Sequence, residues 1–161
     1  MRALGVAVAL LVVAGVAPVQ AQEYGPQPDA ATQREILAIR EAAWRAWFGN
    51  DQAALTRIVP DELVALGWDG GAWDDRLRTL AQMREFAKGG RTLTSLAFPR
   101  NVWQQYGEVV ILYTGFRLTL TDRAGKAEEI SGRGTEVFVR RRGRWIHTGW
   151  HLDTVGNGGA A

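Results

Sequence analysis

The chain has 161 residues, of which 47% are hydrophobic, and it has no cysteine and a near balance of 19 Lys and Arg against 17 Asp and Glu. This length indicates one domain, and the charge balance gives no reason to expect nucleic acid or an anionic membrane as a partner. The lack of cysteine excludes disulfides and thiol catalysis.

Residues 1–21 have the pattern of a secretory signal peptide. Arg2 gives the positive start, residues 3–16 form an apolar run, and the stretch from Val19 to Ala21 is a small-x-small cleavage site. The apolar run is shorter than the roughly 20 residues that a membrane-spanning helix needs. We therefore expect cleavage after Ala21, a periplasmic or secreted location, and no membrane contact after cleavage.

A linker is expected over residues 22–29, and a helix follows it. The helix has an apolar stripe at helical spacing, and Thr32 and Glu35 fit a capping box. Gly49 is a fitting C-terminal stop.

Two further helices are predicted by capping residues. Asp51 is expected to cap a short helix that Pro60 ends, and Asp74 or Asp75 to cap a third helix that stops at two glycines. Residues 62–68 between these helices are strand-like.

From Arg91 the apolar period changes to that of strands. Four extended segments are predicted, separated by hairpin turns: residues 91–107, 108–122, 127–143 and 144–155. Pro99 within the first segment indicates an edge strand or a bulge. The domain is expected to span residues 30–155, with a disordered tail over 156–161.

Helices followed by antiparallel strands predict an α+β fold, with the helices packed on one side of a curved sheet. Val109 and Ile111 alternate with Val110 and Leu112, so both faces of the second strand are apolar. The helices can cover one face. We expect a second copy of the chain to cover the other, which predicts a homodimer.

The chain resembles the NTF2-like superfamily, in particular its SnoaL-like and DUF4440-type members. The resemblance covers about residues 30–155 and depends on the helical stretch "EILAIREAAWRAWFGNDQAALTRIVPDE", the strand "GRGTEVFVRRRGRW", and the ending Trp145…His151-x-Asp153. It implies a cone-shaped domain in which a strongly curved antiparallel sheet surrounds a pocket and the N-terminal helices close one side. It also implies dimers formed through the convex sheet face.

The chain also resembles the association domain of calcium/calmodulin-dependent kinase, and this likeness implies which residues face the pocket. A gapless alignment and strand alternation give Leu112, Thr114, Phe116, Glu136, Phe138, Trp150 and Leu152. Trp44 from the first helix and Trp68 from the following loop are expected to add to this apolar wall, although Trp44 at helical spacing also fits a core residue. The same alignment puts Trp145, His147, His151 and Asp153 on the opposite face, unless a bulge at Gly149 reverses the parity.

Glu136 is the candidate catalytic residue. A carboxylate among aromatic side chains loses hydration, so its pKa rises and suits a general acid or base. The alternative is an ion pair with a neighbouring arginine, for which Arg117 and Arg133 are the candidates. His151 and Asp153 are the second choice for catalysis.

No metal site and no cofactor are expected. His147 and His151 lie four residues apart, about 13 Å on a strand at roughly 3.3 Å per residue, so they cannot share one ion. The sequence therefore predicts an exported protein that binds a small, mostly apolar ligand. A small acid–base enzyme of isomerase, cyclase or dehydratase type and a non-catalytic dimeric interaction module remain as alternatives.

Overall fold

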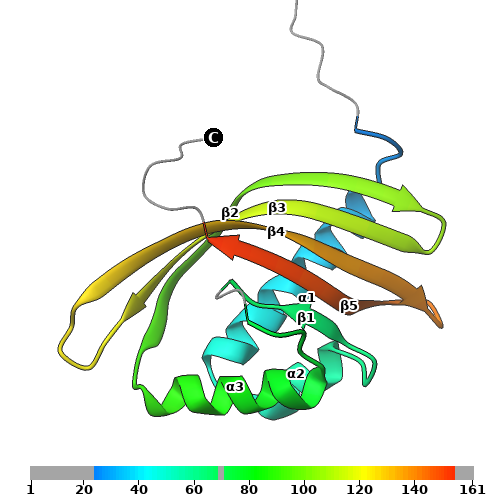
Figure 1. Cartoon of the computed structure of the whole chain (residues 1–161). Helices are drawn as coiled ribbons and strands as arrows, with labels where there is room; N and C mark the ends of the chain where they lie inside the picture. The colour runs from blue at the N-terminus through cyan, green and yellow to red at the C-terminus, as the bar shows by residue number, and fades with distance from the viewer. Residues whose placement is uncertain (1–23, 69–70, 155–161) are drawn as a thin grey trace, which may run out of the picture.

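The computed structural model describes residues 24–68 and 71–154, so the predicted signal peptide and the tail lie outside the described residues. Three helices and a short strand come before four long strands, as predicted (Figure 1). The elements are α1 (Ala30–Phe48), α2 (Gln52–Ile58), β1 (Val64–Leu66), α3 (Arg76–Lys88), β2 (Thr92–Tyr106), β3 (Val109–Thr121), β4 (Ala127–Arg141) and β5 (Arg144–Thr154).

Aspartates cap all three helices. Oδ1 of Asp51 accepts from the backbone N–H of the third residue after it, at 2.8 Å, and Asp75 makes the same 2.8 Å contact at the start of α3. The capping box predicted at Thr32 is wrong. Asp29 is the N-cap of α1, with an extended backbone, and its Oδ1 accepts from the backbone N–H of Thr32 at 2.7 Å. The helix thus begins earlier than predicted, and Gly49 ends it as expected.

The strands form one curved sheet in the order β1-β5-β4-β3-β2. The four long strands are a continuous antiparallel meander, and β1 joins the far edge in parallel with β5. Pro99 lies in β2, at the other edge, and the register shifts between Ala97 and Arg100. Both consequences predicted for this proline, an edge strand and a bulge, are confirmed.

A close backbone contact fixes β1 on the sheet. Gly149 on β5 pairs with Val64, and a Cβ atom built on this glycine would lie 2.6 Å from the carbonyl oxygen of Val64. No other residue type fits there without a backbone shift.

The sheet arches over α1, while α2 and α3 lie beneath its open end (Figure 1). On β3, alternate residues from Val110 to Leu120 are buried against the helices and their neighbours are only half-buried or exposed. Ile36 on α1 packs with Leu112 and Phe138 of this inner face. The predicted α+β arrangement, with helices on one side of a curved sheet, is confirmed.

A bulge in β5 decides which side chains face inward. Val137 pairs with Gly149 but Phe138 pairs with His147, so Thr148 is an extra residue on β5. Trp150 is therefore the next residue whose side chain lies on the same face as that of His147. Without the bulge, residues 149 and 151 would lie on that face.

This bulge corrects part of the predicted face assignment. Trp145 and His147 are 5% and 2% exposed on the inner face, so their predicted position on the opposite face is wrong. The reason is the parity reversal that a bulge produces. His151 and Asp153 come after the bulge and do lie on the outer face, where both are exposed and the imidazole Nε2 is 3.5 Å from the carboxylate.

The outer face of the sheet is aliphatic at its centre. Its half-buried members are Val109, Ile111, Val137, Val139 and Ile146. Within the described residues, no helix is both long enough and apolar enough to cross a membrane.

Candidate functional site

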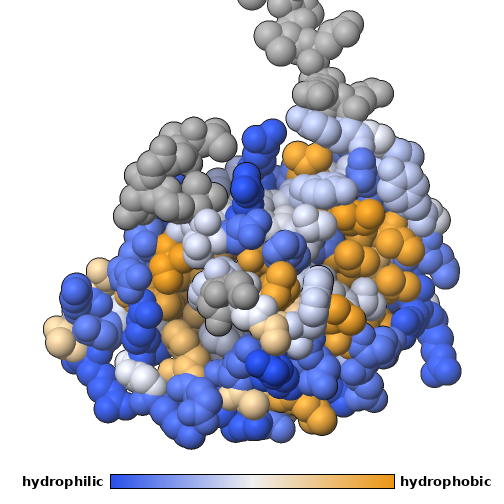
Figure 2. Space-filling view, in the orientation of Figure 1, coloured by the Kyte–Doolittle hydropathy of each residue, from blue (hydrophilic) through white to orange (hydrophobic). Residues whose placement is uncertain are grey.

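A cavity of about 520 Å³ lies between the helices and the inner face of the sheet. Its walls come from α1, α3, the loop around Trp68 and the ends of β3, β4 and β5. Figure 2 shows hydrophobic side chains between the sheet and α3 on this face of the molecule, with hydrophilic residues along the rim. The principal aromatic wall residues are Trp44, Trp47, Phe48, Trp68, Phe86 and Trp150.

These aromatic rings pack on one another as well as on the cavity. The centroids of Trp47 and Phe86 are 5.1 Å apart, which joins α1 to α3. Trp44 lies 6.2 Å from Trp68 and 5.0 Å from Phe116 of the sheet. The rings therefore form a continuous apolar wall that crosses from the helices to the sheet.

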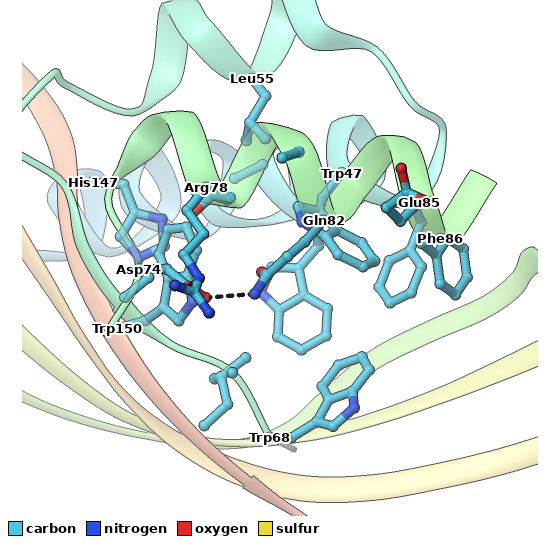
Figure 3. A pocket seen from close by; sticks show the side chains of 18 of the residues that line it. Trp47, Leu55, Trp68, Asp74, Arg78, Gln82, Glu85, Phe86, His147 and Trp150 are labelled. Atoms are coloured by element: carbon cyan, nitrogen blue, oxygen red, sulfur yellow. Dashed lines mark hydrogen bonds and ion pairs between the residues drawn. The ribbon is translucent and has the colours of Figure 1, made fainter. Parts of the chain in front are cut away.

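Polar side chains gather at one end of the cavity (Figure 3). Asp74 is 5% exposed, and its Oδ2 accepts from Nε2 of Gln82 at 2.8 Å. Nε of Arg78 lies 2.7 Å from Oδ1 of the same carboxylate. His147 and Trp150 line the cavity beside Asp74, so apolar and hydrogen-bonding surfaces meet here.

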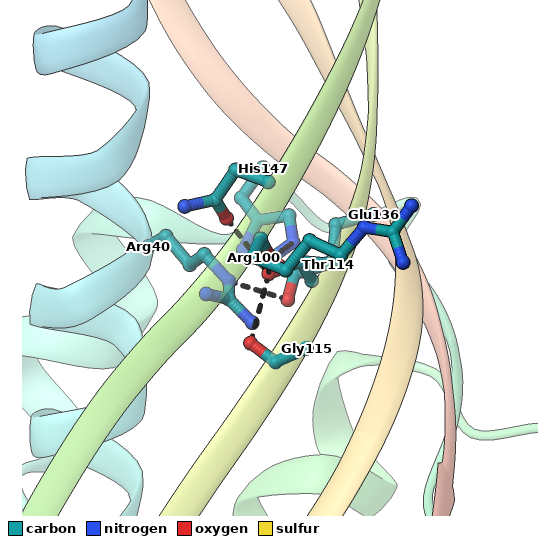
Figure 4. Close-up of polar contacts among 7 residues, drawn as sticks. Arg40, Arg100, Thr114, Gly115, Glu136 and His147 are labelled. Carbon is teal, nitrogen blue, oxygen red and sulfur yellow. Dashed lines mark hydrogen bonds and ion pairs between the residues drawn. The ribbon is translucent and has the colours of Figure 1, made fainter. Parts of the chain in front are cut away.

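A buried charged pair lies behind this end of the cavity (Figure 4). Nε of Arg40 donates to Oε1 of Glu136 at 2.6 Å, and neither side chain is exposed. Nε2 of His147 lies 3.3 Å from the other carboxylate oxygen. The guanidinium also stacks on Phe98, with Cζ 3.5 Å from the ring centroid.

Burial and pairing act in opposite directions on the pKa of Glu136. Loss of hydration is the larger effect and raises this pKa above its ordinary value, and the charge and hydrogen bond of Arg40 offset part of the rise. Since an arginine side chain stays protonated in proteins, a neutral Glu136 would leave the Arg40 charge buried alone. We conclude that the pair is ionised at neutral pH. Burial, with a smaller effect of Arg40, lowers the pKa of His147 to about 3, so its ring is neutral.

Solved structures share this architecture. Aln2 from a Streptomyces species matches with a TM-score of 0.70 and 13% identity, over 80% of this chain and 94% of that one. An NTF2-like protein from Cytophaga hutchinsonii matches with a TM-score of 0.62 and 13% identity, over 76% of this chain and 98% of that one. The association domain of CaMKII from C. elegans matches with a TM-score of 0.63 and 16% identity, over 77% and 96%.

The fold is NTF2-like. This confirms the predicted NTF2-like fold, and the SnoaL-like or DUF4440-type assignment stays a prediction. No protein-family model and no curated protein sequence matches the chain. Identities this low establish a shared fold and not a shared activity.

The NTF2-like cavity includes half of the predicted ligand-binding residues. Trp44, Trp68, Trp150 and Leu152 line it. The other four predicted residues lie on the inner face of the sheet but do not line the cavity: Leu112, Thr114, Phe116 and Phe138, all of which are at most 5% exposed. They belong to the core because α1 packs directly on this part of the sheet.

The candidate catalytic residues lie away from the cavity wall. Glu136 faces inward as predicted, but it is fully buried and does not line the cavity. The predicted alternative, an ion pair with an arginine, is confirmed, but the partner is Arg40 of α1, so the two arginines named for it, Arg117 and Arg133, are wrong. Both arginines lie on the outer face and approach other carboxylates there. His151 and Asp153, also on the outer face, do not line the cavity either.

Four polar residues of this region were not identified from the sequence as site residues: Arg40, Asp74, Gln82 and His147. For Arg40 a signal exists, because it falls on the apolar stripe of α1 between Ile36 and Trp44. A charged residue on a buried helix face implies a buried partner. Among the described residues, no group of three or more His, Asp or Glu side chains is placed to hold one metal ion.

Proposed function

We propose that this NTF2-like protein binds a small, neutral, mostly apolar molecule in the cavity. The observation that carries the proposal is an aromatic cavity of about 520 Å³, within the size range of small-molecule sites. Asp74, Arg78 and Gln82 form a polar group in this otherwise largely apolar wall, as in sites that orient an apolar ligand.

The charge pattern of the wall supports a neutral ligand. Each charged residue on the described wall already has a partner of opposite sign. Asp74 is paired with Arg78 at 2.7 Å, Glu85 with Lys88 at 2.6 Å, and Arg91 with Glu128 at 2.5 Å. A charged ligand would lose hydration without gaining an unpaired counter-charge, which is unfavourable.

The position of Glu136 favours binding over acid–base catalysis through that residue. A general base must lie within hydrogen-bond reach of the proton it takes. Glu136 is fully buried, outside the cavity wall, and held by Arg40. We infer a structural role for this carboxylate.

We further propose that the protein is exported and forms homodimers through the outer face of the sheet. The sequence pattern of residues 1–21 supports export. The aliphatic centre of the outer face supports a partner there, and one structural neighbour is an association domain.

The binding proposal is tested with three probes of one shape and different charge. These are neutral β-methoxynaphthalene, anionic β-naphthoate and cationic β-naphthylmethylammonium. Titration calorimetry, with quenching of the wall tryptophans as a second signal, is expected to show the neutral probe binding at least about tenfold more tightly than either ion.

Two alanine variants show where the probe binds. Ala81 of α3 lines the cavity, whereas Ala42 of α1 is exposed outside it. Ala81→Phe is expected to weaken binding by about tenfold or more because the new ring occupies the cavity. Ala42→Phe carries the same small helix-propensity cost and leaves the cavity free. Equal affinity in both variants would contradict the proposal.

A further inference from the structure

The imidazole of His147 is held as a fixed part of the cavity wall. It is 2% exposed, and its ring stacks on Phe138 with centroids 4.3 Å apart and planes inclined by 13°. Trp150 lies on another side at 5.0 Å. His147 is also among the residues that line the cavity, next to Asp74 (Figure 3).

The buried pair behind the ring decides which nitrogen carries the proton. Oε2 of Glu136 lies 3.3 Å from Nε2 of His147. The carboxylate is ionised because it is the counter-ion of the buried Arg40 guanidinium. An anionic oxygen repels a nitrogen lone pair, so the proton of the neutral imidazole lies on Nε2. Nδ1 is then left as a hydrogen-bond acceptor.

Neither nitrogen of the ring has a hydrogen bond among the described residues, although both are buried. Nε2 lies 3.3 Å from Oε2 of Glu136 without hydrogen-bond geometry, and no donor is bonded to Nδ1. A buried acceptor without a donor is unfavourable, and native proteins rarely leave one. Because the ring belongs to the cavity wall, a donor on a bound ligand is the group that can satisfy this nitrogen.

We propose that His147 is the polar anchor of the cavity, and that the ligand is a neutral ring-containing alcohol or phenol whose hydroxyl donates to Nδ1. This inference rests on the proposed binding function. A hydroxyl supplies the missing donor, whereas an ether or a carboxylate supplies none. The paired charges at this end of the cavity leave no counter-ion for a charged donor such as an ammonium group.

The first test compares β-naphthol with its methyl ether on the full chain by titration calorimetry. The two probes share one ring system, but only the naphthol donates a hydrogen bond. We expect the naphthol to bind about tenfold more tightly, the effect of one hydrogen bond. The variant His147→Phe keeps an aromatic ring against Phe138 but has no acceptor nitrogen. In this variant the naphthol and the ether should bind with about equal affinity.

The second test detects the contact at the nitrogen itself. The chain has 2 histidines, so His151→Gln leaves His147 as the single source of histidine signals in nitrogen-15 NMR. His151 lies on the outer face and away from the cavity. Naphthol is expected to shift the Nδ1 resonance in the direction of a hydrogen-bonded acceptor, and the ether is expected to leave it nearly unchanged. A purely structural histidine would respond alike to both probes.

The outcomes separate this inference from the binding proposal. Preference for the naphthol together with a selective Nδ1 shift supports both. Equal binding of the two probes, with no selective shift, overturns the role of His147 and leaves the binding proposal standing. If neither probe binds, the binding proposal fails and the inference fails with it, because the methyl ether is the same β-methoxynaphthalene that serves as the neutral probe in the calorimetric test above. If His147→Phe does not fold, the comparison of the two probes on the unmodified chain and the NMR measurement still show whether the hydroxyl donates to Nδ1 of His147.

Discussion

Nε of Arg40 on α1 donates to Oε1 of Glu136 on β4 at 2.6 Å, and both side chains are fully buried. This contact joins the first helix to the middle of the sheet, across 96 residues of sequence. We infer that Glu136, the candidate catalytic residue of the sequence analysis, instead holds the helix on the sheet, and its second carboxylate oxygen lies 3.3 Å from Nε2 of His147.

Replacement of Glu136 by glutamine tests this structural role. Glu136→Gln keeps the side-chain shape but leaves the Arg40 charge buried without a counter-ion. We expect the free energy of unfolding to fall by about 3–5 kcal/mol, measured by urea denaturation. Glu129→Gln on the same strand is the matched control, because Glu129 is exposed and 3.7 Å from an exposed arginine. That change should lie within about 0.5 kcal/mol of the unmodified protein. Similar stability of both variants would refute the structural role.

The depressed pKa of His147 predicts a loss of stability in acid. In the unfolded chain this group binds a proton below about pH 6.5, but in the folded protein burial holds the pKa near 3. Between these values the unfolded state binds more protons, so the free energy of unfolding falls as the pH falls, by up to about 1.4 kcal/mol per pH unit. The contribution is complete above the unfolded pKa.

Denaturation curves across that window, measured on matched histidine variants, isolate the effect. His147→Phe should lose this part of the pH dependence, and His151→Gln on the outer face should keep it. An unchanged slope in His147→Phe would show that the acid sensitivity arises elsewhere.

The aliphatic outer face predicts a dimer in solution. Light scattering on the mature protein should give about twice the chain mass. Ile111→Lys places a charge at the centre of that face and is expected to produce monomers or insoluble protein. Leu77→Lys is the control, because Leu77 is 73% exposed on α3 and away from the sheet. A uniform monomer of the unmodified protein would rule out the proposed interface.

The N-terminal pattern predicts processing on export. Mass spectrometry of protein isolated from its native host should find a chain that begins near Gln22, because Ala21 ends the small-x-small site. Detection of an intact Met1 in the mature fraction would be inconsistent with a cleaved signal peptide.

The sequence alone determined the order of the elements and the class of fold. Aspartate caps at Asp51 and Asp75, the stop at Gly49 and the change of apolar period at Arg91 are local signals, because each depends on residues within a few positions. The bulged edge strand at Pro99 follows in the same way, since proline cannot donate to the sheet.

Only the tertiary structure decided which side chains meet. The extra residue at Thr148 reverses the face of everything before it on β5, and nothing local in the sequence requires a bulge at that place. The same dependence on packing places Arg40 against Glu136, and brings Asp74 and His147 into the wall of one cavity. Helix rotation and strand register are set by burial across the whole domain. The position of His147 in the cavity wall therefore depends on how α1, α3 and β5 pack together, and the local sequence does not determine it.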